Sequence, residues 1–212
     1  MHEGEAQPPV IRVLVVADND LFRTGLASLL GALADIEVVA QASGGRMGVQ
    51  QASELRPDVV LMDLPMPDLE AREAIRGVLE LSPATRVVAF TMLPSEQDVA
   101  DALQAGASGL LARDTPIDDV VAAVRAAAGG SAWLSPRTAE LMLEDGRRAD
   151  PDREPDSPKL DHLSSRELDV LRLIARGLEN AEIAEVLNIS PRTVKDYVWS
   201  IRAKLGRPRG DG

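Results

Sequence analysis

The feature that most limits the fold of this chain is a regular alternation of short apolar runs with longer amphipathic segments across residues 10–130. The runs are rich in Val, Ile and Leu, as buried strands are, and the segments between them repeat apolar residues every three to four positions, as helices do. Strands that alternate with helices form a parallel sheet with helices on both faces. We therefore predict an α/β domain with a doubly wound, five-stranded parallel sheet. Its strands are expected at 10–17, 36–41, 58–63, 86–91 and 108–113, and its helices at 19–33, 44–55, 70–81, 95–106 and 116–130.

Polar side chains lie at or just after the ends of four of these strands: Asp18, Asp63, Thr91 and Arg113. One aspartate in such a place is ordinary in turns. In a parallel sheet, however, the carboxyl ends of the strands meet at one edge, where ligands bind. Two carboxylates can hold a hard cation such as Mg²⁺, and one can act as a nucleophile toward phosphorus. A hydroxyl and a cation can bind phosphoryl oxygens. The sequence therefore indicates a site for a metal ion and a transferred phosphoryl group.

Two stretches of the sequence resemble the receiver domain of response regulators: RPDVVLMDLPMP (56–67) and AGASGLLARDTP (105–116). The resemblance extends over nearly all of residues 10–130 and implies a flavodoxin-like fold. It also implies that Asp63 is a phosphoacceptor. The donor would be a sensor histidine kinase or a small phosphodonor.

The same resemblance assigns roles to the other polar residues at the strand ends. Asp18, Asp63 and the backbone carbonyl of Pro65 would bind Mg²⁺. Thr91 would be the switch hydroxyl, and Arg113 would stand where receivers normally carry a lysine.

The predicted pocket departs from the usual receiver pattern. Ala17 takes the place of the first of two adjacent acids, so we expect Mg²⁺ to bind weakly. Arg113 keeps the charge of lysine but is larger and forked. Leu110 replaces an aromatic residue, and Pro65 restricts the loop that would supply the metal-binding carbonyl. Two hypotheses stay open: phosphorylation of Asp63 shifts a dimerisation equilibrium, or the receiver is degenerate and serves as a phosphorylation-independent dimerisation or ligand-sensing module.

The C-terminal part of the chain differs from the rest in charge. Residues 1–158 carry 26 acidic and 13 basic side chains, whereas residues 159–212 carry 8 acidic and 10 basic ones. A basic segment on an acidic protein is a candidate for binding a polyanion. Amphipathic patterns in 163–177, 180–188 and 189–206 predict three helices, and the last two, joined by a tight turn, are typical of a helix-turn-helix.

The segments LSSREL, GLENAEIAEVLNIS and TVKDYVWSIRAKLG resemble the LuxR-type helix-turn-helix domain of NarL/FixJ response regulators. The resemblance implies that the outward face of the last helix binds double-stranded DNA. The residues on that face are Arg192, Thr193, Lys195, Asp196 and Trp199. Arg192 and Lys195 suit phosphates or guanine edges, whereas Asp196 would repel phosphate or accept from a cytosine amino group.

The pattern predicts three regions: a receiver at 8–130, a helix and flexible linker at 131–160, and the DNA-binding domain at 161–212. The chain ends in RPRGDG, which cannot form the fourth helix that is usual in the family. We therefore expect homodimerisation through the receiver.

Other classes of function find little support in the sequence. The chain has no cysteine and only two histidines, and no apolar run is long enough to span a membrane, so we expect a cytoplasmic protein. Phosphotransferases that use such an aspartate carry an acid two residues later, where this chain has Pro65. We therefore do not expect an enzyme. A regulator that acts through protein contacts and no longer binds DNA stays a further alternative.

Overall fold

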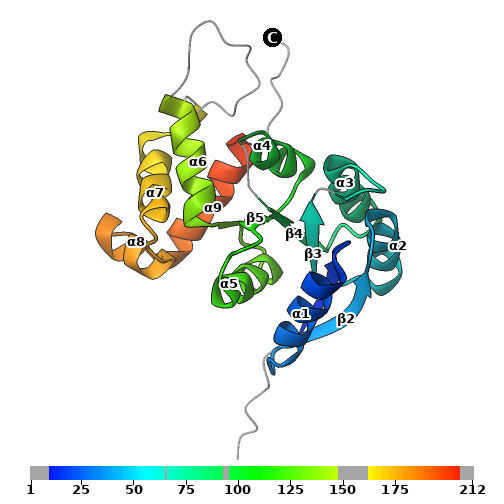
Figure 1. Ribbon diagram of the computed structural model, residues 1–212. Coiled ribbons are helices and arrows are strands. Elements are labelled where there is room, and N and C mark those ends of the chain that lie inside the picture. The colour runs from blue at the N-terminus through cyan, green and yellow to red at the C-terminus, as the bar shows by residue number, and fades with distance from the viewer. Residues whose placement is uncertain (1–9, 65, 93–95, 148–161, 206–212) are drawn as a thin grey trace, which may run out of the picture.

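The structure is a computed structural model and describes residues 10–64, 66–92, 96–147 and 162–205. An N-terminal α/β part is followed by a group of short helices (Figure 1). No helix within these ranges is long and apolar enough to cross a bilayer.

The α/β part is a single parallel sheet with its crossover helices. The strands are β1 (Ile11–Val16), β2 (Ile36–Ala42), β3 (Val59–Leu64), β4 (Arg86–Thr91), β5 (Gly109–Ala112) and β6 (Trp133–Leu134). The helices are α1 (Asp20–Gly31), α2 (Gly45–Leu55), α3 (Ala71–Leu81), α4 (Glu96–Ala105) and α5 (Ile117–Ala128). The strand order is β2-β1-β3-β4-β5-β6, and all neighbouring strands are parallel. This order confirms the doubly wound sheet that the alternating pattern predicts.

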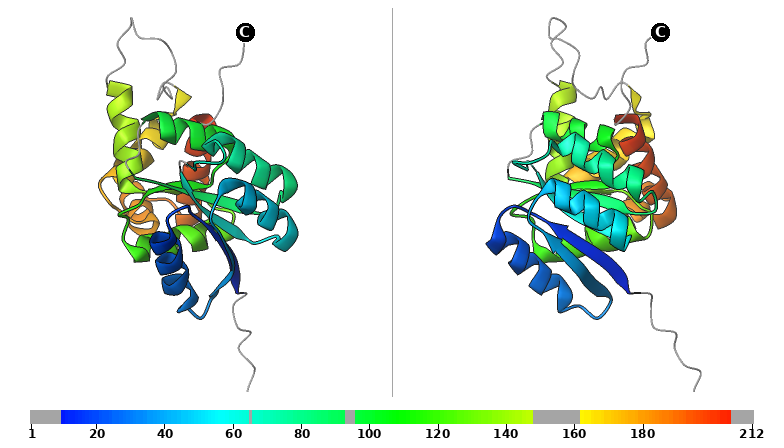
Figure 2. Two further views of the ribbon diagram at one scale, coloured as in Figure 1. Left: turned by 45° about the vertical axis from the view of Figure 1, so that its right-hand side comes forward. Right: turned by 90° about the vertical axis from the view of Figure 1, so that its right-hand side faces the viewer.

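Layers of helices cover the two faces of the sheet (Figure 2), and alternate residues of the strands pack against opposite layers. In β1, Val13 and Val15 pack in the cluster that α1 and α5 cover. Leu14 and Val16 pack in the cluster that α2, α3 and α4 cover. Because both faces are buried, the strands need apolar residues at every position, which explains their continuous apolar runs.

The sheet has one strand more than the five that the sequence predicts. In β6, Trp133 pairs with Gly109 and Leu134 with Leu110. Two residues are too short to give a strand pattern, so the sequence predicts only a helix and linker over 131–160. It adds to β5 because that edge offers free backbone groups, and the Trp133 N–H donates to the Ser108 carbonyl at 2.9 Å.

The helical part contains the three predicted helices: α7 (Ser165–Ala175), α8 (Asn180–Leu187) and α9 (Pro191–Leu205). Ser164 and Glu167 form a capping box at the start of α7. Ile183 of α8 and Val194 of α9 are fully buried, and they pack in the same core cluster as residues of α7.

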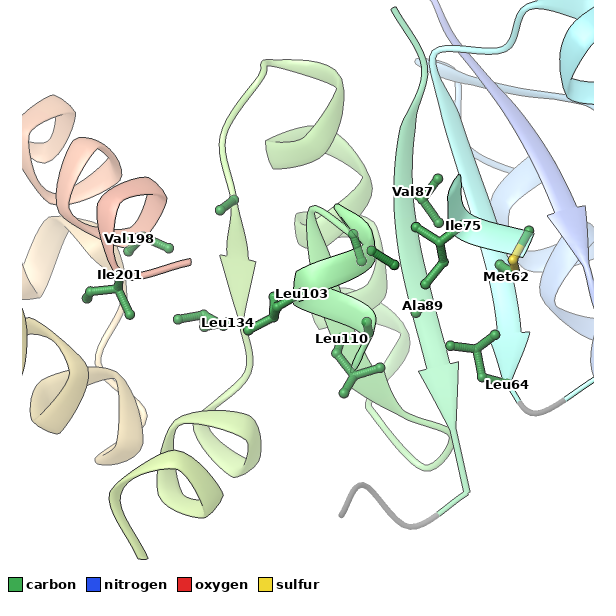
Figure 3. Close-up of a cluster of buried hydrophobic side chains, with 14 of the residues drawn as sticks. Met62, Leu64, Ile75, Val87, Ala89, Leu103, Leu110, Leu134, Val198 and Ile201 are labelled. Atoms are coloured by element: carbon green, nitrogen blue, oxygen red, sulfur yellow. The ribbon is translucent and has the colours of Figure 1, made fainter. Parts of the chain in front are cut away.

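The α/β part and the helical part share one apolar core. Leu134 of β6, Leu103 of α4 and Ile201 of α9 belong to the same buried cluster (Figure 3). At its edge, Arg202 donates from Nη1 to the Ala107 carbonyl at 3.0 Å and to Ser108 Oγ at 3.4 Å. The helix α6 (Pro136–Arg147) also contacts α7. The flexible tether predicted toward residue 160 falls largely on residues 148–161, which lie outside the described ranges.

Candidate functional site

The polar residues from the strand ends lie together at the carboxyl edge of the sheet. Leu64, which follows Asp63 in β3, pairs with Thr91 of β4. Asp18 lies two residues beyond β1, the other neighbour of β3. Arg113 follows β5 directly, and its backbone N–H donates to the Thr91 carbonyl at 2.9 Å. The topology therefore brings two acids, a hydroxyl and a guanidinium to one edge.

Arg113 and Asp63 form a two-pronged ion pair. Arg113 Nε donates to Asp63 Oδ1 at 3.0 Å, and Nη2 donates to Asp63 Oδ2. The Asp63 side chain is 1% exposed and that of Arg113 is 23% exposed. Both carboxylate oxygens of the buried Asp63 thus accept hydrogen bonds from one partly exposed, geometrically matched cation.

Asp18 lies near the same guanidinium. Its Oδ1 is 3.9 Å from Arg113 Nη2, and its side chain is 42% exposed. Burial raises the pKa of Asp63 above its usual range, although the hydrogen bonds and charge of Arg113 oppose this, and the negative charge of Asp18 adds to the rise. Arg113 is therefore the group that stabilises the ionised form of Asp63.

Two further residues hold Arg113, and the sequence did not point to them. The guanidinium carbon lies 5.1 Å from the centre of the Phe22 ring, a cation–π distance. Arg113 Nη1 donates to Met92 Sδ at 3.2 Å. Phe22 could have been found as an aromatic residue in the first turn after the Asp18 loop, but Met92 carries no such signal.

The loop after Asp63 is anchored to the start of α2. The Asp68 carboxylate accepts from the backbone N–H groups of Gly45 at 2.9 Å and Arg46 at 3.0 Å, and these bonds lower the pKa of Asp68. A Cβ atom at Gly44 would lie 2.9 Å from Asp68 Oδ2, so a side chain there would displace the Asp68 carboxylate. Asp68 thus caps α2 from outside the helix. Pro65, the predicted source of a metal-binding carbonyl, lies outside the described residues.

With Arg113 in this arrangement, a divalent cation finds no free oxygen of Asp63. Both oxygens of Asp63 already bind Arg113, whose guanidinium also lies near Asp18. Ala17, which takes the place of the first of the two adjacent acids, is buried and offers no side-chain ligand. Among the described residues, no three His, Cys, Asp or Glu side chains are grouped to hold a metal. Arg113 supplies the positive charge that an ion would otherwise bring to this edge.

The predicted DNA-binding residues form one outward face of α9. Arg192, Lys195, Asp196 and Trp199 are exposed, and Trp199 is 54% exposed. Their spacing of three and four residues places them on one side of the helix. Thr193 is only half-buried, and its hydroxyl lies 2.8 Å from Ser190 Oγ at the helix start.

A buried carboxylate ties α9 to α7. Glu167 accepts hydrogen bonds from Ser200 Oγ at 2.6 Å and from Lys204 Nζ at 2.7 Å, while also capping α7 through the Ser164 N–H at 2.6 Å. Burial alone would raise the pKa of Glu167, but these bonds lower it to about 2. This network fixes the outward face of α9 relative to the rest of the helical part.

Two family models match the two parts of the chain. The response regulator receiver domain matches residues 13–125. The family described as bacterial regulatory proteins, luxR family, matches residues 161–208.

Full-length proteins are similar to this chain over both parts. The nitrate/nitrite response regulator protein NarL of Escherichia coli K12 is 36% identical over 195 residues, which are 91% of this chain and 88% of NarL. The transcriptional regulatory protein LiaR of Bacillus subtilis is 36% identical over 196 residues, 92% of this chain and 91% of LiaR. The crystal structure of the response regulator ChrA has a TM-score of 0.55 at 32% identity and covers 95% of this chain and 93% of ChrA.

Proposed function

Because the chain belongs to the response regulators that join a receiver domain to a LuxR-type DNA-binding domain, we propose that phosphorylation of Asp63 controls its binding to promoters. A DNA-binding transcriptional regulator is the function common to this family. No family model or relative favours the alternative of a phosphorylation-independent module. We also propose the domain boundaries 8–130, 131–160 and 161–212, and action in the cytoplasm, where DNA is accessible.

The observation that carries the proposal is the position of Asp63. It lies at the carboxyl end of a central strand, 1% exposed, with Asp18 near it and Arg113 bound to both of its oxygens. A carboxylate so placed, next to a cation and at the ligand-binding edge of a parallel sheet, is suited to attack phosphorus.

The transfer needs one change in the ion pair. Arg113 must release one oxygen of Asp63, and that oxygen attacks the phosphorus of a phosphohistidine on a sensor kinase, or of a small acyl phosphate. A P–O bond to Asp63 forms as the P–N or P–O bond of the donor breaks, and the leaving group takes the electron pair. Arg113 can then bind the new phosphoryl oxygens, and Thr91 on the adjacent strand can donate its hydroxyl to them.

Receiver domains generally bind Mg²⁺ for phosphorylation. In this chain we propose that Mg²⁺ would bind weakly, through Asp18 and Asp63, and in competition with Arg113. The ion would neutralise charge at the phosphoryl oxygens. Arg113 supplies one cation at the same edge without the metal.

DNA binding is assigned to the outward face of α9. In this proposal Arg192 and Lys195 contact phosphates or guanine edges, with Thr193 and Trp199 beside them, and their exposure supports it. Asp196 on the same face lowers the affinity for phosphate. We propose a homodimer formed through the receiver that binds a two-fold operator.

The test compares the unmodified protein with Asp63→Asn after incubation with acetyl phosphate, with and without Mg²⁺. Intact mass spectrometry should show one added phosphoryl group on the unmodified protein alone. Sedimentation velocity and binding to DNA selected from a random pool should then show a larger dimer fraction and tighter DNA binding. If the mass of both proteins stays unchanged with acetyl phosphate and with a partner kinase, Asp63 is not the phosphoacceptor.

A further inference from the structure

We propose that Met92 is an oxidation site at the edge of the sheet, and that its sulfoxide draws Arg113 away from Asp63. The oxidant is hydrogen peroxide or another peroxide. The loosening of the ion pair follows from the contacts of Arg113. Its effect on signalling rests on the proposed function, in which Asp63 is the phosphoacceptor.

Met92 is the most exposed methionine among the side chains that the structure describes. It follows β4 directly and is 60% exposed. Met47 on α2 is 47% exposed, whereas Met62 and Met66 are buried. Because a peroxide must reach the sulfur atom to oxidise it, Met92 and Met47 should react before the two buried residues.

The Met92 sulfur is already in contact with the cation that holds Asp63. Arg113 Nη1 donates to Met92 Sδ at 3.2 Å, and this contact lies at the exposed side of the site. A thioether sulfur is a weak acceptor, so the bond is weaker than the two that Arg113 makes to Asp63. The sulfur also keeps a second lone pair, which is free to react with a peroxide.

Oxidation converts this weak acceptor into a strong one. A lone pair of Met92 Sδ attacks one oxygen of hydrogen peroxide, and an S–O bond forms as the O–O bond breaks. The departing hydroxide takes the proton from the transferred oxygen and leaves as water. Sulfur gives up an electron pair and the peroxide is reduced. The sulfoxide oxygen carries a partial negative charge, and enzymes can reduce it back to the thioether.

The geometry of the guanidinium gives the direction of the effect. Arg113 binds Asp63 through Nε and Nη2, which form one edge of the planar group. Nη1, which binds Met92, is the corner opposite that edge. A stronger acceptor at Nη1 therefore competes with Asp63 for the same rigid cation and favours positions of Arg113 farther from Asp63. The sulfoxide thus frees the carboxylate oxygen that must attack phosphorus.

The test treats the full chain with hydrogen peroxide and follows two readouts that need no phosphorylation. Peptide mass spectrometry should show one added oxygen at Met92 and Met47 before Met62 or Met66. Nitrogen-15 NMR should show the Arg113 Nε–H signal, assigned with Arg113→Lys, moving toward the position of an arginine without a carboxylate partner. Met92→Leu should abolish this movement, and Met47→Leu, which removes the exposed methionine on α2, should leave it intact. Met92→Gln, which carries a carbonyl acceptor on an unbranched side chain, should produce the movement without peroxide.

Two results would overturn the proposal: Met92 remains reduced after Met62 is oxidised, or Met92 is oxidised and the Arg113 signal stays in place. The effect on signalling is measured separately, as the rate of mass gain with acetyl phosphate. The oxidised protein should react about two- to tenfold faster than peroxide-treated Met92→Leu. Equal rates would refute that effect. If no form gains mass, the phosphoacceptor role of Asp63 fails, and the NMR result still decides whether Met92 controls Arg113.

Discussion

Arg113 donates to both carboxylate oxygens of Asp63, so the predicted phosphoacceptor is paired with an internal cation before any donor arrives. The pair is held from the side by Phe22 and Met92. The reactivity of Asp63 toward a phosphodonor therefore depends on how easily Arg113 breaks its hydrogen bonds to Asp63.

The first prediction concerns Arg113→Lys. Lysine keeps the charge but makes a single point contact in place of the fork. We expect phosphorylation by acetyl phosphate to become about three- to tenfold faster, as measured by the rate of mass gain. Titration calorimetry should also show tighter Mg²⁺ binding. The matched control is Arg125→Lys, because Arg125 forms a similar two-pronged pair with Asp35 away from the site. A slower reaction would mean that the fork of Arg113 assists transfer.

A second prediction concerns the titration of Asp63. Burial raises the pKa of Asp63, and Arg113 opposes the rise. Since the folded pKa lies above the unfolded value, the native state takes up the proton first as pH falls, and this group's contribution to stability increases as pH falls through that window. Carbon-13 NMR of the carboxyl group should place its pKa above 3.8, the ordinary value. Arg113→Ala should raise it further. A pKa at or below the ordinary value in the unmodified protein would contradict this account.

The third prediction concerns Glu167, whose pKa is shifted downward, whereas that of Asp63 is shifted upward. Its pKa is lowered from 4.5 to about 2, so its stabilising effect is complete above the unfolded value and is lost as pH falls through the folded one. Glu167→Gln should lower the free energy of unfolding of the helical part by about 1–3 kcal/mol at neutral pH. Urea unfolding followed by circular dichroism would measure it. Glu185→Gln, at an exposed position on α8, should change stability by less than about 0.5 kcal/mol.

The fourth prediction concerns the outward face of α9. Lys195→Ala should weaken DNA binding and lower the salt slope by about one, because one phosphate contact is lost. Asp196→Asn should strengthen binding, since it removes repulsion from phosphate. Fluorescence anisotropy across a salt series would measure both. Arg172→Ala on α7, away from this face, is the control, and an equal effect there would show that the contact surface lies elsewhere.

The sequence predicted the sheet and the gathering of Asp18, Asp63, Thr91 and Arg113 because strand ends and parallel topology follow from local patterns. It did not predict that Arg113 would bind Asp63 directly. That pairing depends on side-chain directions and on Phe22, which comes from α1, far from both residues in the sequence. Nor did it predict β6, whose two residues form a strand only because the edge of β5 is there to receive them.

The packing of the helical part against the sheet also escaped prediction. Val198 and Ile201 lie in the core of the helical part, and that core continues into the α/β part through Leu134. An apolar helix face indicates burial without indicating the partner. Arg202 gave no local sign that it would bind Ala107 and Ser108.

The hydrogen bonds of Arg202 to Ala107 and Ser108 define the distance between the Asp63 site and a contact of α9. Ala107 and Ser108 lead directly into β5, and the next residue after that strand is Arg113. The strand has four residues, a span of about 13 Å. A displacement of β5 that accompanied the departure of Arg113 from Asp63 would therefore reach α9 over this short span through the Arg202 side chain.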